Sequence, residues 1–184
     1  LEDMRNFIDV LEEDVGVPRE CHVPFVSGGK GFHDDLYPPG WQPPASVNFH
    51  AIMREFALGL ATEAKVVIDT GVYDRVRAYR AANSRHPRSG LFKRHIPVDV
   101  LFKATPGELL DMAREPAPFA LPSTDGMGPI ESLVAEWARA EKTVAEKMAA
   151  EDARRREREA GEREASVNSL TRAFLAGEVD VGDR

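Results

Sequence analysis

A glycine-rich segment near the start of the chain combines residue types that bind phosphate. Residues 27–33 read SGGKGFH, which places one Lys and one His on a turn made largely of glycine. Backbone N–H groups and cationic side chains on such a turn can donate hydrogen bonds to phosphate oxygens. A lone His is more often structural, but His33 follows three glycines and a Lys and is poorly explained by packing. The segment indicates a nucleotide site. It is not a Walker A loop, because no Gly-Lys-Ser/Thr follows a four-residue spacer.

A second feature is an acidic residue at the end of an apolar run. Residues 66–68 read VVI, a pattern that predicts a strand delivering Asp69 to its end. An Asp in this position can ligate a divalent cation. The alternative is an Asp that caps a turn before Thr70 and Gly71, and the spacing alone leaves both interpretations open.

A basic run follows closely. Residues 75–94 contain Arg and Lys at short intervals, and Asp74 is the only acidic residue between Asp69 and Asp99. An ordinary exposed surface would mix acidic and basic residues, so the run indicates phosphate binding.

These segments, in this order, resemble the archaeo-eukaryotic primase superfamily, and in particular the bifunctional DNA primase/polymerase domains of phages, plasmids and integrated elements. SGGKGFH resembles the second motif of that family, and VVID resembles the third. The most specific part of the resemblance is residues 72–93, which read VYDRVRAYRAANSRHPRSGLFK. The resemblance extends from about Leu1 to Leu121.

The resemblance implies template-directed nucleotidyl transfer from an NTP or dNTP, with Mg²⁺ or Mn²⁺ as the cofactor. It makes Asp69 a catalytic metal ligand and His33 a catalytic residue that donates to the incoming triphosphate. The other residues implied to bind the nucleotide are Ser27, Lys30, Gly31, Arg77 and Arg80. Those implied to bind the single-stranded DNA template are Asn83, Ser84, Arg85, Arg88 and Lys93.

One departure from the family bears on activity. The first motif of the family, Asp-x-Asp or Asp-x-Glu, does not occur upstream of Ser27, and the chain begins with Leu1. We therefore expect a fragment truncated before that motif and inactive by itself. The alternatives are a catalytically dead module that binds nucleotide or DNA, and an interaction protein that links the core to a replicative helicase. Asp34 and Asp35 read as a solvated loop, with Asp35 as a weaker alternative metal ligand.

Composition limits the class of protein. A chain of 184 residues with 42% hydrophobic residues can form one domain with an appendage. The net charge of −7 argues against coating nucleic acid through bulk charge. A single cysteine, Cys21, excludes a disulfide framework within the chain. No apolar stretch approaches the roughly 20 residues that span a bilayer, so we expect a soluble, cytoplasmic protein.

The pattern of apolar residues predicts an α+β fold in which a small mixed sheet is flanked by helices. We expect a helix up to Val15, a strand over residues 22–27 in which Pro24 implies an edge or irregular position, and a helix over residues 49–60. Residues 105–108 read TPGE, a capping box that starts another helix. The core should cover residues 1–122.

The remaining residues, 123–184, should form a hinge and a charged helical tail. The tail is almost continuously charged from Glu151 to Glu164, so this part cannot pack by itself and should be an exposed helix. A smaller amphipathic piece follows, with Val167, Leu170, Phe174 and Leu175 on one face.

Overall fold

The computed structural model describes residues 1–123 and 126–178, and the side chains of these except residues 164–167. The chain divides into two compact units, residues 1–141 and 142–184. In the first unit, five helices accompany a three-stranded sheet within the described residues, counting the start of the last helix, so the α+β class is confirmed. Residues 124 and 125 of the predicted hinge, and the side chain of Val167, lie outside the described part.

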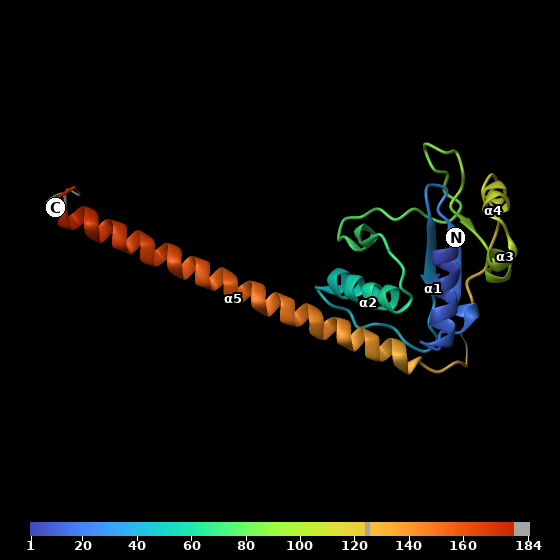
Figure 1. The fold of residues 1–184 in the computed structure, drawn as a ribbon, viewed down its shortest axis with the longest axis horizontal. Coiled ribbons are helices and arrows are strands. Elements are labelled where there is room, and N and C mark those ends of the chain that lie inside the picture. The colour runs from blue at the N-terminus through green and yellow to red at the C-terminus, as the bar shows by residue number, and fades with distance from the viewer. Residues whose placement is uncertain (124–125, 179–184) are drawn as a thin grey trace. The chain divides into compact units, whose positions relative to one another are not determined.

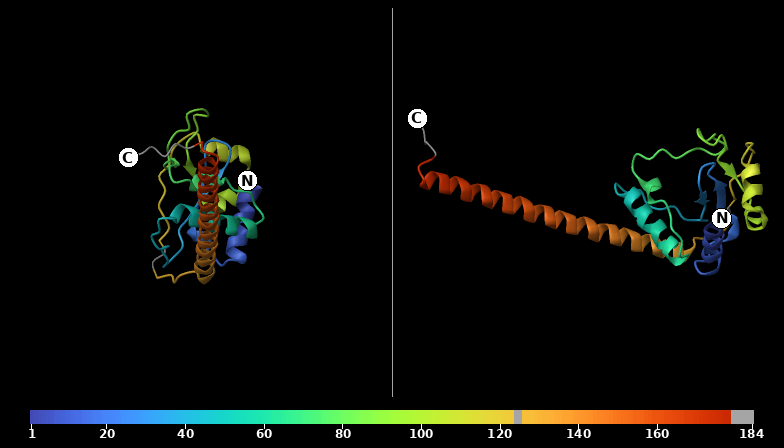
Figure 2. Two further views of the ribbon diagram at one scale, coloured as in Figure 1. Left: turned by 90° about the vertical axis from the view of Figure 1, so that its left-hand side faces the viewer. Right: turned by 45° about the horizontal axis from the view of Figure 1, so that its top comes forward.

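The sheet is built around the glycine-rich segment. It consists of β1 (His22–Val26), β2 (Phe32–Leu36) and β3 (Arg94–His95), in the order β2-β1-β3 (Figure 1, Figure 2). Both pairings are antiparallel, whereas we expected a mixed sheet. The tight turn between β1 and β2 explains the antiparallel pairing, because a parallel pair needs a long crossover.

Of the two positions expected for Pro24, the edge is wrong, because β1 is the central strand. The proline nevertheless limits the length of the pairing between β1 and β3. The N–H of Ile96 donates to the carbonyl of Pro24 at 2.9 Å, and Pro24 has no N–H to return the bond. The β1–β3 ladder ends at this pair, which accounts for a β3 of only two residues.

One face of the sheet carries the main core. The core residues come from β1, from the segment after β3, and from α1 (Glu2–Glu13), α3 (Val98–Lys103) and α4 (Pro106–Met112) with its end. They are Ile8, Val26, Ile96, Leu101, Leu109 and Ala113. Because side chains alternate along a strand, Phe25, His33 and Asp35 point to the opposite face.

The predicted helix boundaries are largely confirmed. The first helix ends at Glu13, and Gly16 follows with a φ of 77°, the left-handed conformation typical of a helix terminus. The helix α4 begins with the expected capping box. Here the N–H of Thr105 donates to Glu108 at 2.7 Å, and the N–H of Glu108 donates to the Thr105 hydroxyl at 3.4 Å.

The predicted strand over residues 66–68 is wrong. The helix α2 (Phe49–Glu63) is followed by Lys65 at a φ of 53°, and residues 66–69 then form neither helix nor strand. Val67 is 94% exposed. An apolar run becomes a strand only when it finds a neighbour to pair with, and residues 66–69 have no such neighbour in the described sheet.

An aromatic cluster joins α2 to the start of the last helix, α5 (Glu131–Leu175), within the first unit. The rings of Trp41 and Trp137 meet edge to face at 5.7 Å, and Phe49 and Phe56 lie against Trp137. Trp137 is 3% exposed, as expected for a packing role rather than base stacking. This cluster explains why the first unit extends to residue 141, beyond the predicted boundary at residue 122.

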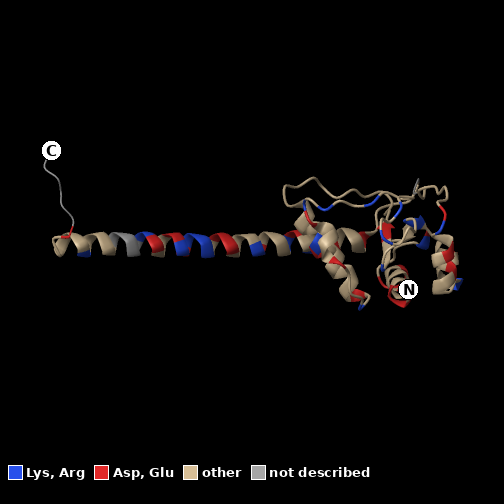
Figure 3. Cartoon of the chain, turned by 90° about the horizontal axis from the view of Figure 1, so that it is seen from above, with Lys and Arg blue, Asp and Glu red and all other residues tan. Residues whose placement is uncertain are grey.

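The second unit contains the rest of α5, from Lys142 to Leu175. Its described side chains are largely exposed, and acidic and basic residues alternate along it (Figure 3). Asp152 and Arg155 form an ion pair of 2.8 Å, which is the i,i+3 support expected for such a helix. No helix in the described residues is long and apolar enough to span a membrane.

Candidate functional site

The glycine-rich segment forms the turn between β1 and β2. The N–H of Ser27 donates to the carbonyl of Gly31 at 2.9 Å. The Ser27 hydroxyl accepts from the N–H groups of Gly29 and Gly31 at 3.1 and 3.2 Å. Ser27 and Gly31 therefore shape the turn, and these N–H groups are used inside it rather than offered to a phosphate. Lys30 is exposed at its tip.

The turn packs closely against the end of the basic run. Residues 83–93 form a small hairpin in which the N–H of Asn83 donates to Lys93 and the N–H of Lys93 donates to Ser84, at 2.8 and 2.9 Å. A Cβ on Gly28 would lie 2.9 Å from the carbonyl oxygen of Leu91, so only glycine fits there. The structure thus brings the glycine-rich turn and the end of the basic run together.

His33 lies on β2 under an aromatic ring. Its imidazole stacks on Tyr79 with the centroids 5.1 Å apart, and its Nδ1 is buried without a hydrogen-bond partner among the described residues. Burial lowers the pKa of His33, and Lys93 and Arg80 lower it further. Asp35 and Asp69 oppose this shift, so both carboxylates lie within electrostatic reach of the imidazole.

Asp35 and Lys93 form a pair beneath the same ring. The Tyr79 hydroxyl donates to Oδ1 of Asp35 at 2.7 Å, and Nζ of Lys93 lies 3.8 Å from Oδ2 of Asp35. The Lys93 ammonium also lies 3.8 Å from the centroid of the Tyr79 ring, a cation–π contact. Burial lowers the pKa of Lys93, whereas burial and the hydrogen bond to Asp35 raise the pKa of Tyr79.

The prediction of a solvated loop at Asp34 and Asp35 is wrong, because both residues belong to β2. Their side chains point to opposite faces of the sheet, since neighbouring strand residues alternate. Asp34 pairs with His22 on one face, and Asp35 joins His33 on the other. Asp35 therefore lies on the same face of the sheet as His33.

Arg80 completes a cluster that also contains His33, Asp35, Tyr79 and Lys93. Its Nη2 donates to the carbonyl of Ser27, which ties the basic run to the glycine-rich turn. Its Nη1 is buried without a partner among the described residues. The positive charge of Arg80 lowers the pKa of both His33 and Lys93, so the three side chains lie close together.

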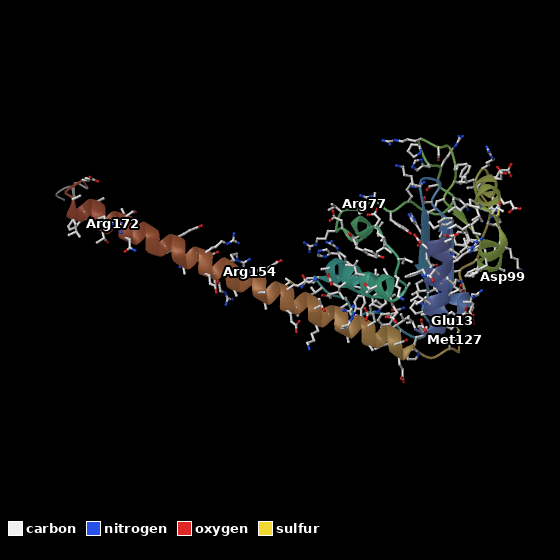
Figure 4. The ribbon with its side chains drawn as sticks, viewed as in Figure 1. Glu13, Arg77, Asp99, Met127, Arg154 and Arg172 are labelled. Atoms are coloured by element: carbon white, nitrogen blue, oxygen red, sulfur yellow. The ribbon has the colours of Figure 1, made fainter. Side chains whose placement is uncertain are left out.

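Asp69 adopts the turn-capping arrangement. Its Oδ1 accepts from the N–H of Gly71 at 2.9 Å, at the start of the 3-10 helix η2 (Thr70–Tyr73). Its Oδ2 lies 4.0 Å from Nη2 of Arg77, and its side chain is 72% exposed. Arg77, labelled in Figure 4, lies on the segment after η2. No group of three or more His, Cys, Asp or Glu residues suited to a metal occurs in the described part of the chain.

The residues predicted to bind DNA have mixed environments. The Asn83 amide donates to and accepts from the backbone of Ala117, at 2.9 and 3.2 Å, and so holds the chain together. The Ser84 hydroxyl is buried without a partner among the described residues. Lys93 is 1% exposed and faces Asp35, so its ammonium is not on the surface that DNA would contact here.

Two arginines of the predicted DNA set keep exposed side chains. Nε of Arg85 donates to the carbonyl of Gly90 at 2.9 Å, and Arg88 lies at the tip of the hairpin. These two remain accessible to a phosphate backbone.

Tyr79 was not predicted as a site residue, although it lies directly before Arg80 in the sequence. Asp35 was considered only as a weaker metal ligand. Its position two residues after His33 in a strand would have placed both side chains on one face. The contact of Tyr79 with β2 had no comparable signal, because it joins residues 44 positions apart.

Comparisons of the chain with protein-family models, with curated proteins and with solved structures each gave no match.

Proposed function

We propose that residues 1–141 bind a nucleoside triphosphate as the core of a DNA primase-polymerase that transfers nucleotidyl groups on a single-stranded template. The observation that supports this is the pair of buried nitrogens, Nδ1 of His33 and Nη1 of Arg80, that have no partner among the described residues. A buried donor without a partner costs about 1–3 kcal/mol. Phosphate oxygens would accept from Arg80 and from the His33 tautomer that carries its proton on Nδ1.

The charge of the cluster suits this ligand. Asp35 offsets the buried ammonium of Lys93, which leaves the Arg80 guanidinium without a carboxylate partner among the described residues. A guanidinium already fixed through one nitrogen to the Ser27 carbonyl presents its other nitrogen at little entropic cost. Lys30 and Arg77 are exposed and can add charge at the rim.

The metal cofactor that the family resemblance implies fits this site less well. Asp69 and Asp35 are the carboxylates that would be offered to Mg²⁺ or Mn²⁺. One oxygen of Asp69 accepts from Gly71, the other faces Arg77, and Asp35 is held by Tyr79 and Lys93. The described residues alone do not fit a two-metal centre. This observation favours a second candidate, a module that binds nucleotide and DNA without catalysis.

Calorimetric titration with a non-hydrolysable dNTP tests the proposed site. His33→Ala and Arg80→Ala should each weaken binding about 10-fold to 100-fold, the effect of removing a hydrogen bond to a charged group. Lys103→Ala removes an exposed charge on α3 and should leave the affinity unchanged. Unchanged affinity for His33→Ala, with wild-type melting, would remove His33 from the site.

Primer extension with Mg²⁺ or Mn²⁺ separates the two candidates. We expect the 184-residue chain to bind dNTP and single-stranded DNA without extending a primer. Extension that Asp69→Ala abolishes would instead establish the enzyme. Extension that persists in Asp69→Ala and is lost in Asp35→Ala would assign the metal to Asp35.

A role for α5 in binding a partner in the cytoplasm is supported by exposed apolar side chains near its end, Leu170, Phe174 and Leu175. A soluble helix rarely exposes such residues together without a partner. The partner we propose is a replicative helicase. Capture of the full chain by purified helicase should be lost in Leu170→Asp and Phe174→Asp, and capture that persists in both would exclude this end of α5.

A further inference from the structure

One half-exposed side chain contacts three of the groups that could engage a ligand in the site. The Tyr79 ring stacks on His33, its face covers the Lys93 ammonium, and its hydroxyl donates to Asp35. Tyr79 itself is 50% exposed. Among the described residues, Tyr79 is the one that joins all three groups through a stacked ring, a cation–π contact and a hydrogen bond.

Three nitrogens of the candidate site are buried in this arrangement. Lys93 is 1% exposed, and Nδ1 of His33 and Nη1 of Arg80 are buried. Because these nitrogens are buried, phosphate oxygens can meet them only after a covering group moves. Tyr79 lies over two of these side chains, His33 and Lys93, so access to them depends on its position.

The backbone that carries Tyr79 lies outside the helices and strands. Residues 74–82 form neither helix nor strand, and Val76 is exposed. A backbone hydrogen bond within the segment joins Arg77 to Asp74 at 3.1 Å. Segments with few buried contacts open at low free-energy cost, in contrast to the strands beneath.

We propose that Tyr79 is the gate of the phosphate site: it covers His33 and Lys93 and holds Asp35 when no ligand is bound, and it swings out when a polyphosphate binds. The proposal rests on the proposed function, because it names what regulates entry to the same site. The apparent dissociation constant of a gated site is the intrinsic constant divided by the open fraction. Weakening the closed state therefore tightens binding.

The probe that tests the gate is inorganic tripolyphosphate, titrated calorimetrically into the full chain. It has no base, so a change in base stacking on Tyr79 cannot disguise the effect of opening. Tyr79→Phe keeps the ring and removes only the bond to Asp35, and should tighten binding about threefold to tenfold. Tyr79→Ala also removes the ring that covers His33 and Lys93, and should tighten it further.

Tyr37→Phe is the matched control, because it removes a hydroxyl one residue beyond the end of β2. It should leave the affinity at the wild-type value. Thermal melting of each variant shows whether it is folded, and Tyr79→Phe, which changes no volume in the core, keeps the test valid if Tyr79→Ala unfolds.

The outcomes separate the gate from the proposed function. Binding that is measurable in the wild type and equal or weaker in Tyr79→Phe overturns the gate and leaves the phosphate site intact. Absence of binding in the wild type and in both folded Tyr79 variants overturns both proposals. Tighter binding in Tyr79→Phe, with Tyr37→Phe unchanged, supports both.

Discussion

Nδ1 of His22 and Oδ2 of Asp34 lie 2.6 Å apart on the face of the sheet that points away from His33. Their side chains are 0% and 5% exposed, and the second polar atom of each has no partner among the described residues. A buried pair of this kind holds β1 and β2 in register, because a slip of one residue would separate the two groups. It thereby fixes which residues of β2 face the candidate site.

Breaking the His22–Asp34 pair should destabilise the first unit strongly. Removing one partner of a buried hydrogen-bonded pair leaves the other unsatisfied, which costs about 1–3 kcal/mol and more where a charged group is left. We expect His22→Ala and Asp34→Ala each to lower the free energy of urea unfolding by about 3 kcal/mol, and the double variant to lose less than the sum. Asp111→Ala, which breaks an exposed pair with Arg114, should change it by at most about 1 kcal/mol. Additive effects of His22→Ala and Asp34→Ala would contradict the pairing.

Substitution of Gly28 tests the packing of the two motifs. Gly28 has a φ of 69°, and an added Cβ would lie 2.9 Å from Leu91 O and 3.1 Å from Phe92 O. Gly28→Ala should therefore lower the free energy of unfolding by about 2 kcal/mol or more. Gly31→Ala lies in the same turn with no atom within 4 Å of its Cβ position, and should cost far less. Equal losses in thermal melting would show that the close approach of Leu91 does not exist in solution.

Stability should fall as the solution becomes mildly acidic. Burial lowers the pKa of His33 and of His95 below the ordinary value of 6.5, so the folded state favours the neutral imidazoles. Below pH 6.5 these two imidazoles therefore bind more protons in the unfolded chain than in the folded chain. The stability contributed by the neutral rings is therefore complete above that pH and is lost as the pH falls through the lowered values.

Urea unfolding at about pH 7.5 and at about pH 5 measures this dependence. His33→Gln and His95→Gln should each lose less stability between the two conditions than the wild type. A wild-type loss that neither substitution reduces would assign the pH dependence to other groups.

Binding of single-stranded DNA should weaken with salt if the exposed arginines contact phosphates. Removing one cation that pairs with a phosphate reduces the slope of log K against log salt by about 0.7 for a single strand. Arg85→Ala and Arg88→Ala should each show this reduction in fluorescence anisotropy titrations, because both side chains are exposed. Lys103→Ala should not, since it lies outside the basic run. A loss of affinity that is the same at every salt concentration would indicate a non-electrostatic role.

The elements specified by local rules could be predicted from the sequence. The helix of residues 49–63 followed from its apolar spacing, and the helix of residues 106–112 from the capping box of Thr105 and Glu108. Each of these signals lies within a few residues, so it does not depend on the rest of the chain. The strand expected at residues 66–68 failed for the opposite reason, because a strand needs a partner that the sequence does not name.

The sequence was enough to predict which segments contribute to the candidate site. It was not enough to predict how their side chains are buried and paired. The glycine-rich turn and the basic run were identified, and the structure brings His33 and Arg80 into one cluster. The burial of Lys93 and the internal use of the Asn83 amide could not be predicted. A charged residue in a basic run is normally exposed, and only a carboxylate such as Asp35, 58 residues away in the chain, makes its burial tolerable.

By itself, the sequence determined the elements whose hydrogen bonds close over three or four residues, together with the chemical types available to the site. The tertiary structure decided which of those side chains share a face, which are buried, and which are covered by Tyr79. The reason is physical. Local order depends on neighbours along the chain, whereas the desolvation, pairing and exposure of a side chain depend on residues that only folding brings near.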